Sequence, residues 1–301
     1  MIQPAPLKKG DLIYITAPAK AIEPEFVYFA QNYLEKQGFR VEISPNCLGN
    51  YNYFSGTDQE RLADLQQGID HPEAKAILCA RGGYGCVRIV DQLQWANMLR
   101  EPKWLIGFSD ITVFHHRLFK LGVQSIHGTM PLNFQTNSIA ALQTLVDSIT
   151  GKKSNLTWNT TLHNQIGKAT GKLIGGNLSI IYSLIATNDA YYFEGNVLFL
   201  EDLSEQLYHL DRMFFALKKS GILDRISGLV IGGMTDLKDT VVPFGMTIEE
   251  IVLQHFTFSR IPIAFGAPIG HIDDNQAVIV GAEVELEVNN VFSSISYNNE
   301  H

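Results

Sequence analysis

The sequence has few cysteines, no cluster of basic residues and no long hydrophobic run. Its three cysteines, Cys47, Cys79 and Cys86, are odd in number and lack CxxC spacing, which argues against a disulfide framework or a zinc site. The formal net charge is −8 and no Lys/Arg-rich block is present, which argues against a nucleic acid partner. No stretch approaches the roughly 18 uninterrupted apolar residues of a membrane-spanning helix. The apolar run near Met1 is too short for a signal peptide, so we expect a cytoplasmic protein that binds neither nucleic acid nor membrane.

The first half of the chain alternates short hydrophobic runs with helical patterns. A chain of 301 residues, 46% hydrophobic and 18% charged, has globular composition and is long enough for one large or two medium domains. We predict strands over residues 11–19, 40–44, 74–80 and 103–108, and helices over 24–39, 58–69, 87–93 and 111–122. This alternation is typical of βαβ units in a parallel sheet, which makes the fold class α/β.

The alternation stops in a polar segment between residues 150 and 171, which is rich in Thr and Asn and has no sustained period. We therefore predict a first domain over 1–150, a linker over 151–170 and a second domain over 171–301. The second domain shows strand-like runs at 196–202, 228–234, 277–281 and 283–288, with one clear helix at 204–221. It is expected to be mixed and richer in β structure.

A lone serine, Ser109, lies on the turn between a predicted strand and a predicted helix in "KWLIGFSDITVFHH". Ligands of parallel sheets bind at the carboxyl ends of the strands, and the N–H groups of a following helix favour negative charge. The turn resembles a nucleophile elbow, although position 111 is Ile where that motif has Gly. A helix-capping serine is the other interpretation, and the turn alone leaves both open.

A nucleophilic serine needs a base, and nine histidines are available. His115 and His116 follow Ser109 within the predicted helix and fit packing or surface roles. His127 ends a predicted strand of the same domain and is a candidate by position. His271 lies in the loop "GAPIGH", where glycine and proline turns fix the imidazole; capping a turn is its other interpretation.

The base in turn needs an acid to orient it, and Glu201 and Asp202 end the apolar run "NVLFLED". A strand-end charge exposed to water is the commoner case. An oxyanion hole also needs uncrowded backbone N–H groups, which Gly82 and Gly83 in "ARGGYG" can supply. A phosphate-binding turn is the competing interpretation, but the segment lacks both the G-x-G-x-x-G spacing and the P-loop ending.

Five motifs in order resemble the LD-carboxypeptidase family of serine peptidases: "ARGGYG", "IGFSD", "GGNLS", "LEDLSEQLYHLDRM" and "GAPIGH". The family includes cytoplasmic murein tetrapeptide carboxypeptidases and microcin C immunity peptidases. The resemblance implies a flavodoxin-like N-terminal domain, a swivelling β-rich C-terminal domain and a homodimer. It also implies catalysis without a metal or an organic cofactor.

The resemblance also implies a catalytic triad of Ser109, Glu201 and His271. The implied oxyanion donors are the backbone N–H groups of Asp110 and of the turn at Gly82 and Gly83. The expected reaction cleaves an L,D peptide bond and releases the terminal D-alanine of a muropeptide tetrapeptide.

Three further residues are candidates for substrate binding. Arg81 could hold the substrate carboxylate or form a structural ion pair. Asn177 could bind the peptide backbone or cap a helix, and Tyr84 could line the site or pack.

Three alternatives to the murein reaction remain open. A microcin-type immunity peptidase would use the same triad on a peptidyl or aminoacyl nucleotide. A class I amidotransferase would favour Cys where this chain has Ser109. A non-catalytic ligand-binding protein would not require Ser109, Glu201 and His271 to converge.

Overall fold

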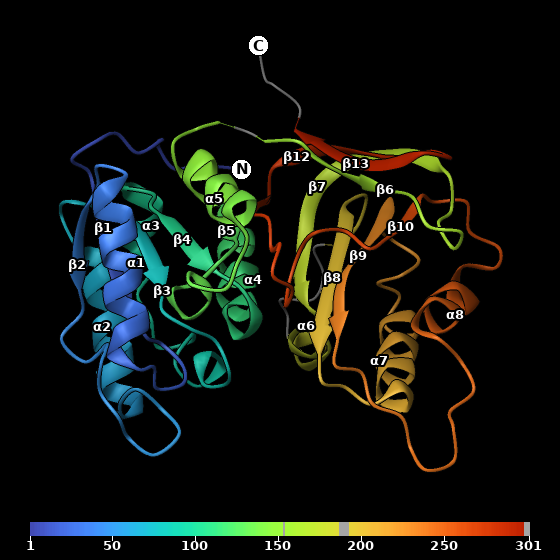
Figure 1. Cartoon of the computed structure of the whole chain (residues 1–301), viewed down its shortest axis with the longest axis horizontal. Helices are drawn as coiled ribbons and strands as arrows, with labels where there is room; N and C mark the ends of the chain where they lie inside the picture. The colour runs from blue at the N-terminus through green and yellow to red at the C-terminus, as the bar shows by residue number, and fades with distance from the viewer. Residues whose placement is uncertain (153, 187–192, 298–301) are drawn as a thin grey trace. The chain divides into compact units, whose positions relative to one another are not determined.

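The computed structural model describes residues 1–152, 154–186 and 193–297, and the chain divides into two units (Figure 1). The first unit comprises Met1–Lys153 and Asp273–Gly281, and the second comprises Ser154–Ile272 and Ala282–His301. Each unit is built around one β-sheet. Among the described helices, none is both long enough and apolar enough to cross a membrane.

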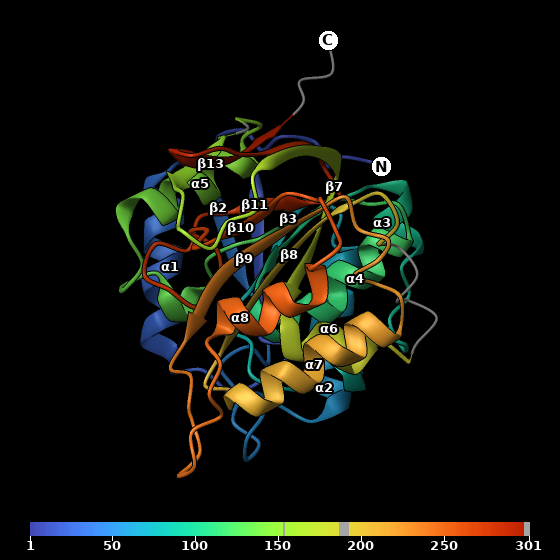
Figure 2. The ribbon, with the colours of Figure 1, turned by 90° about the vertical axis from the view of Figure 1, so that its right-hand side faces the viewer.

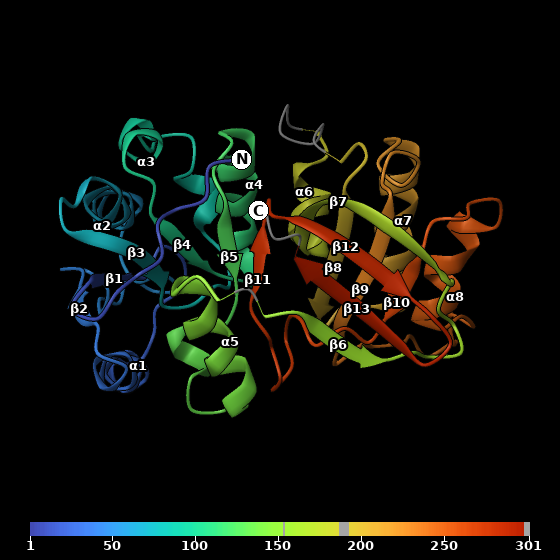
Figure 3. The ribbon, with the colours of Figure 1, turned by 90° about the horizontal axis from the view of Figure 1, so that it is seen from above.

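The sheet of the first unit is parallel except at one edge. Its order is β2 (Arg40–Ile43), β1 (Leu12–Thr16), β3 (Ala74–Cys79), β4 (Trp104–Gly107), β5 (Ser125–His127) and then the antiparallel β11 (Val278–Val280). Figure 3 shows α1 (Pro24–Lys36) and α5 (Ile139–Ile149) on one face, with α2 (Asp58–Asp70), α3 (Ala96–Arg100) and α4 (Thr112–Lys120) on the other. The order 2-1-3-4-5 is that of flavodoxin-like folds, as predicted.

Burial explains why the sequences of these strands are continuous apolar runs. Every residue of β1 and of β4 is buried, because helices cover both faces of a parallel sheet. The flanking helices carry clear start and stop signals. A capping box between Thr57 and Glu60 starts α2, and α1 begins at Pro24 and ends before Gly38, whose φ is +97°.

The helix predicted over 87–93 is wrong. The structure has only a 3₁₀ turn, Cys86–Arg88, at this place. The turn follows Gly85, whose φ is +138°, and a segment of only seven residues is too short to form a stable helix without further support. The short α3 and the longer α5 were not predicted.

The sheet of the second unit is mixed, as predicted. Its parallel part contains β10 (Ile263–Phe265), β9 (Gly228–Thr235), β8 (Val197–Leu203) and β7 (Gly167–Asn177). Its antiparallel part adds β12 (Glu283–Val288), β13 (Phe292–Tyr297) and β6 (Leu156–Asn159). Figure 2 shows α6 (Leu178–Leu184), α7 (Leu207–Lys219) and α8 (Ile248–Leu253) together on one face of the parallel part.

The domain boundaries differ from the prediction in two places. The predicted linker 151–170 contains β6 and the start of β7, whose exposed and half-buried residues alternate without an apolar period. Residues 273–281, predicted in the second domain, belong to the first unit because β11 pairs with β5. Sequence order does not reveal such a return, since the two paired strands lie far apart in the chain.

Candidate active site

Ser109 lies two residues after the end of β4 and is the first residue of a 3₁₀ turn, Ser109–Ile111, that leads into α4. Its φ is +64°, a left-handed conformation that is uncommon for a residue with a side chain. The helix-cap interpretation is wrong, because the N-cap positions of the turn and of α4 are Phe108 and Ile111. Such strained residues are concentrated at functional sites.

The glycine turn after β3 approaches the serine closely. A Cβ on Gly82 would lie 2.9 Å from the Ser109 Cβ, 3.1 Å from its Oγ and 3.1 Å from the backbone nitrogen of Asp110. Gly83 differs, because its φ is +111° and a Cβ there would face Lys20 and the Tyr53 hydroxyl, each at 3.0 Å. Gly82 therefore permits the approach of two backbone segments, and Gly83 permits the turn.

Two buried charged residues hold this turn in place. The Asp110 carboxylate accepts the Cys86 N–H at 2.9 Å, and burial raises the pKa of Asp110. The Arg61 guanidinium donates to the carbonyl oxygens of Pro18 at 2.5 Å and Gly85 at 3.1 Å. The loop after β1, the glycine turn and the serine segment are thereby linked.

The neighbouring candidates Arg81 and Tyr84 are both partly accessible. Arg81 is half-buried and donates from Nη1 to the Ala21 carbonyl oxygen at 2.9 Å, and burial lowers the pKa of its guanidinium. The Tyr84 side chain is 46% exposed and its ring lies 6.2 Å from that of Phe54. Tyr84 therefore packs along one edge and leaves the rest of its ring exposed.

His115 supports the serine turn from within the core. Its Nε2 lies 2.8 Å from the Gly107 carbonyl oxygen and its Nδ1 lies 2.8 Å from the Ser125 hydroxyl. Because a carbonyl only accepts, Nε2 carries the proton and Nδ1 accepts from Ser125. Burial lowers the pKa of His115 to about 3, so the ring stays neutral and fixes the end of β4 two residues before Ser109.

The two other buried histidines of the first unit, His116 and His127, have packing roles. His116, like His115, is buried, so the packing interpretation is confirmed over the surface one. His127 pairs with Gly107 in the sheet and lies fully buried, with its ring 5.7 Å from that of Phe108. It therefore contributes to the floor beneath the serine turn.

In the second unit, Glu201 and His271 form a close pair. The Glu201 side chain on β8 is fully buried, so the solvent-exposed alternative is wrong. Its Oε2 accepts from His271 Nδ1 at 2.6 Å and from the His271 backbone N–H at 3.3 Å. With the proton held on Nδ1, Nε2 is the basic nitrogen of the ring.

Two opposing effects set the pKa of His271. Burial lowers it, whereas the charge and the hydrogen bond of Glu201, with a further contribution from Asp202, raise it; the net effect is a raised pKa. The carboxylate therefore orients the ring and stabilises its protonated form, as the acid of a catalytic triad does.

Glycines make this pair possible. Gly270 has a φ of +104°, and a Cβ there would lie 2.5 Å from the Glu201 Cβ and 2.6 Å from its Oε2. Opposite Glu201, the pairing of β8 with β9 shifts between Leu200 and Asp202, and the Gly233 N–H donates to the Ile269 carbonyl oxygen at 2.8 Å. The sequence reasoning missed this bulge, which the paired glycines of "VIGGM" could have indicated.

Asn177 and Asp202 anchor α6. Asn177 is the N-cap of that helix, with its side-chain oxygen accepting the Ile180 N–H at 3.2 Å and its amide donating to Asp202 at 3.0 Å. Asp202 also accepts the Ser179 N–H at 2.9 Å. The helix-cap interpretation of Asn177 is confirmed, and Asp202 supports the helix while Glu201 contacts His271.

A serine on a strained strand-to-helix turn and a buried Glu–His pair are the components of a serine hydrolase. The chain belongs to the LD-carboxypeptidase family. Residues 13–128 match the LD-carboxypeptidase N-terminal domain and residues 170–286 match the LD-carboxypeptidase C-terminal domain. It is thus a hydrolase of the serine type.

Named relatives share nearly the whole chain. The murein tetrapeptide carboxypeptidase of Pseudomonas aeruginosa is 29% identical over 290 residues, covering 92% of this chain and 93% of its own. The crystal structure of muramoyltetrapeptide carboxypeptidase from Oxalobacter formigenes is 26% identical, with a TM-score of 0.85 over 96% of this chain and 100% of its own. The microcin C7 self-immunity protein of Escherichia coli is 22% identical over 97% of this chain and 95% of its own.

Proposed function

We propose that this protein is a serine carboxypeptidase that hydrolyses an L,D peptide bond and releases the terminal D-alanine of a muropeptide tetrapeptide in cell-wall recycling. The observation that carries the proposal is the buried Glu201–His271 pair at 2.6 Å, found in a family member whose relatives include a murein tetrapeptide carboxypeptidase. The strained conformation of Ser109 supports its role as the nucleophile.

In the first half of the proposed reaction, Ser109 is the nucleophile and His271 is its base. Nε2 of His271 takes the Ser109 proton as Oγ attacks the substrate carbonyl, while Glu201 holds the imidazole and stabilises the imidazolium. The backbone N–H groups of Asp110 and of the turn at Gly82 and Gly83 stabilise the oxyanion. Removing one such donor costs about 100- to 1,000-fold in rate.

In the second half, the acyl-enzyme is hydrolysed. His271 gives its proton to the leaving amine of D-alanine as the carbon–nitrogen bond breaks. A water molecule then attacks the Ser109 ester while His271 takes its proton. As the bond between Oγ and the acyl carbon breaks, His271 returns that proton to Oγ, and the shortened peptide leaves with a new carboxylate.

A carboxypeptidase must recognise the free carboxylate of its substrate, and we assign that role to Arg81. One guanidinium nitrogen contacts the Ala21 carbonyl oxygen, and its Nε has no partner among the described residues. A guanidinium can donate two parallel hydrogen bonds to a carboxylate, which gives high geometric specificity. We assign Tyr84 to the wall of the site, and Asn177 to positioning through α6 and Asp202.

A second candidate is a microcin-type immunity peptidase that cleaves a peptidyl or aminoacyl nucleotide. The similarity to the E. coli microcin C7 self-immunity protein along nearly the whole chain favours it. It would use the same triad.

The proposal extends to a cytoplasmic homodimer that needs no metal or organic cofactor, as the family resemblance implies. Sedimentation equilibrium tests the dimer, and full activity after treatment with EDTA and dialysis tests the cofactor requirement. Loss of activity on chelation would contradict metal-independent catalysis. A monomer at all concentrations would contradict the homodimer.

The decisive experiment measures D-alanine release from L-Ala–γ-D-Glu–meso-diaminopimelate–D-Ala. We expect release by the parent and a loss of about a thousandfold or more in Ser109→Ala. Ser204→Ala is the matched control, because Ser204 also has a left-handed backbone, with a φ of +58°. No release by a folded parent would favour the microcin-type reaction, and equal release by the parent and Ser109→Ala would disprove the proposed nucleophile.

A further inference from the structure

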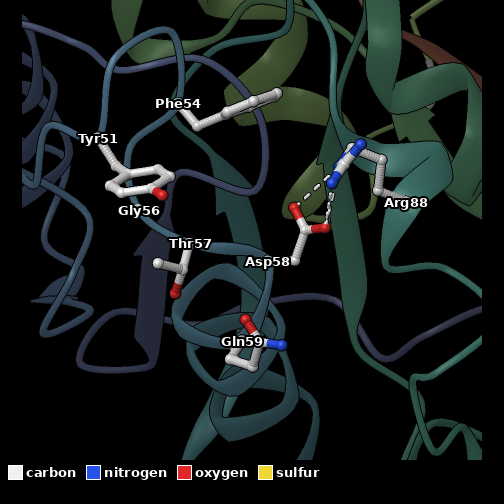
Figure 4. A pocket seen from close by; sticks show the side chains of 7 residues that line it. All are labelled: Tyr51, Phe54, Gly56, Thr57, Asp58, Gln59 and Arg88. Carbon is white, nitrogen blue, oxygen red and sulfur yellow. Dashed lines mark hydrogen bonds and ion pairs between the residues drawn. The ribbon is translucent and has the colours of Figure 1, made fainter.

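The first unit has a second concave site beside the glycine turn. A cavity of about 220 Å³ lies where the loop after β2 enters α2. Figure 4 shows Tyr51, Phe54, Gln59 and the Asp58–Arg88 pair around it. The loop that enters α2 leaves the carboxyl end of β2, so the cavity opens at the sheet edge that also carries Ser109.

The cavity and the serine turn share one segment of backbone. A Cβ on Gly85 would lie 3.1 Å from Cε1 of Phe54, a lining residue of the cavity. Three residues earlier on the same turn, Gly82 approaches Ser109. Arg88, another lining residue, is the last residue of the 3₁₀ turn that begins directly after Gly85. The backbone segment of residues 82–88 therefore contacts both the proposed nucleophile and the lining of the cavity.

The charges that line the cavity are already paired. Arg88 donates from Nε to both Asp58 oxygens at 2.9 Å and from Nη2 to Oδ2 at 2.6 Å. Arg61 also contacts Asp58, and the hydrogen bond from Arg88 lowers the pKa of this carboxylate. An anionic ligand would have to displace Asp58 from Arg88, so the cavity favours an uncharged ligand.

The other lining groups combine an aromatic ring with hydrogen-bonding side chains. Tyr51 is 54% exposed and can offer its ring as a platform. Gln59 and the outer edge of the Asp58–Arg88 pair provide donors and acceptors beside it. An aromatic face with a few convergent polar groups suits a ligand that has one apolar face and several hydroxyls. A pyranose ring has this character, because its C–H groups lie on its faces and its hydroxyls around its rim.

We propose that this cavity binds the N-acetylated amino sugar to which the stem peptide is attached in murein. This inference rests on the proposed function, since it concerns the part of the same substrate remote from the terminal D-alanine. The sugar would stack on Tyr51 and hydrogen-bond to Gln59 and the Asp58–Arg88 pair. The enzyme would then prefer sugar-bearing muropeptides to free peptides.

The test is direct binding of two compounds that lack the bond to be cleaved. Isothermal titration calorimetry compares N-acetylmuramyl–L-Ala–D-isoGln with L-Ala–D-isoGln on the full-length protein. We expect tighter binding of the sugar-bearing compound and a loss of about three- to tenfold in Tyr51→Ala, from the loss of one aromatic contact. Tyr28→Ala is the matched control, because Tyr28 is 48% exposed on α1 and does not line the cavity.

Each outcome supports or overturns the inference. Equal affinity for the two compounds, no binding of the sugar-bearing one, or equal losses in Tyr51→Ala and Tyr28→Ala would overturn it. Adenosine is the third probe, and its tighter binding, lost in Tyr51→Ala, would assign the cavity to a nucleobase instead. Gln59→Ala should weaken sugar binding independently, with thermal unfolding confirming that each variant is folded. Because these binding measurements do not require cleavage, they test the sugar site even if the protein does not release D-alanine.

Discussion

At the scale of single residues, the conformation of Ser109 has a cost that its neighbours must offset. A left-handed residue with a side chain costs on the order of 1–3 kcal/mol. His115 holds the carbonyl of Gly107 just before it, and Asp110 holds the Cys86 N–H just after it. Buried hydrogen bonds therefore fix the backbone on both sides of the serine.

The raised pKa of His271 sets the direction of the pH dependence. A general base must be neutral, so activity should rise as pH passes upward through the pKa of His271. Because the Glu201 carboxylate outweighs burial and raises that pKa, the rising limb of kcat/KM should have its midpoint above the ordinary value of 6.5. A flat profile between pH 5 and about 8 would contradict His271 as the base.

Glu201→Gln removes the charge and keeps the shape of the side chain. We expect kcat to fall by about 10³- to 10⁴-fold, as for the acid of other serine triads. The rising limb should also move to lower pH, because burial then acts on His271 without the carboxylate. Glu205→Gln is the matched control, since Glu205 contacts His209 Nδ1 at 2.5 Å in the same unit. Equal effects of the two variants would show that Glu201 has only a structural role.

At the scale of elements, the loop that carries His271 depends on missing side chains. The bulge at Gly232 and Gly233 on β9 leaves room for the loop backbone; a Cβ on Gly232 would lie 2.4 Å from the Ile269 carbonyl oxygen. Gly270 leaves room for Glu201. The loop is therefore held against the sheet by close backbone contacts and the hydrogen bond from Gly233.

Gly270→Ala should displace the loop from Glu201. We expect a loss of about 2–4 kcal/mol in the free energy of unfolding, from strain and overpacking together, and a loss of most activity. Gly266→Ala is the control, because Gly266 also has a positive φ, +74°, but a Cβ there would meet nothing within 4 Å. It should show only the backbone strain of about 1 kcal/mol. Urea unfolding measures the stability of the two variants, and D-alanine release measures their activity. Equal destabilisation of Gly270→Ala and Gly266→Ala would contradict the steric explanation.

Some of the helices and strands could be predicted from the sequence and others could not. Long periodic segments such as 24–39 and 58–69 predicted α1 and α2 well, because their apolar residues recur at the helical period. β6 and β7 were missed, because their exposed residues obscure any apolar pattern. The sequence pattern also did not predict contacts between segments that lie far apart in the chain. The Glu201–His271 candidates came from motifs, whereas the cavity at Tyr51 and the support from His115 depend on tertiary contacts.

At the scale of the whole molecule, the first unit is completed by a distant part of the chain. β11 adds the edge strand next to β5, and its three residues, Val278, Ile279 and Val280, are buried. Each such side chain contributes about 1.5–3 kcal/mol on burial. Without β11, the edge of β5 would present unpaired backbone groups and apolar surface.

A fragment of residues 1–153 should therefore be unstable and prone to aggregation. Joining residues 273–281 to its end through a flexible Gly/Ser linker should restore a monomeric fold, because the edge strand is then supplied. Gel filtration and urea unfolding compare the two fragments. A stable, monomeric 1–153 fragment would show that β11 contributes little to the unit.

The return of the chain to the first unit begins at Asp273, only two residues after His271. Consecutive Cα atoms are about 3.8 Å apart, so covalent bonds alone keep the His271 Cα within about 7.6 Å of the Asp273 Cα. The Asp273 carbonyl oxygen in turn accepts the Ser138 N–H of the first unit at 2.7 Å. The covalent chain therefore connects the proposed base to a hydrogen-bonded residue of the first unit through a single intervening residue, Ile272.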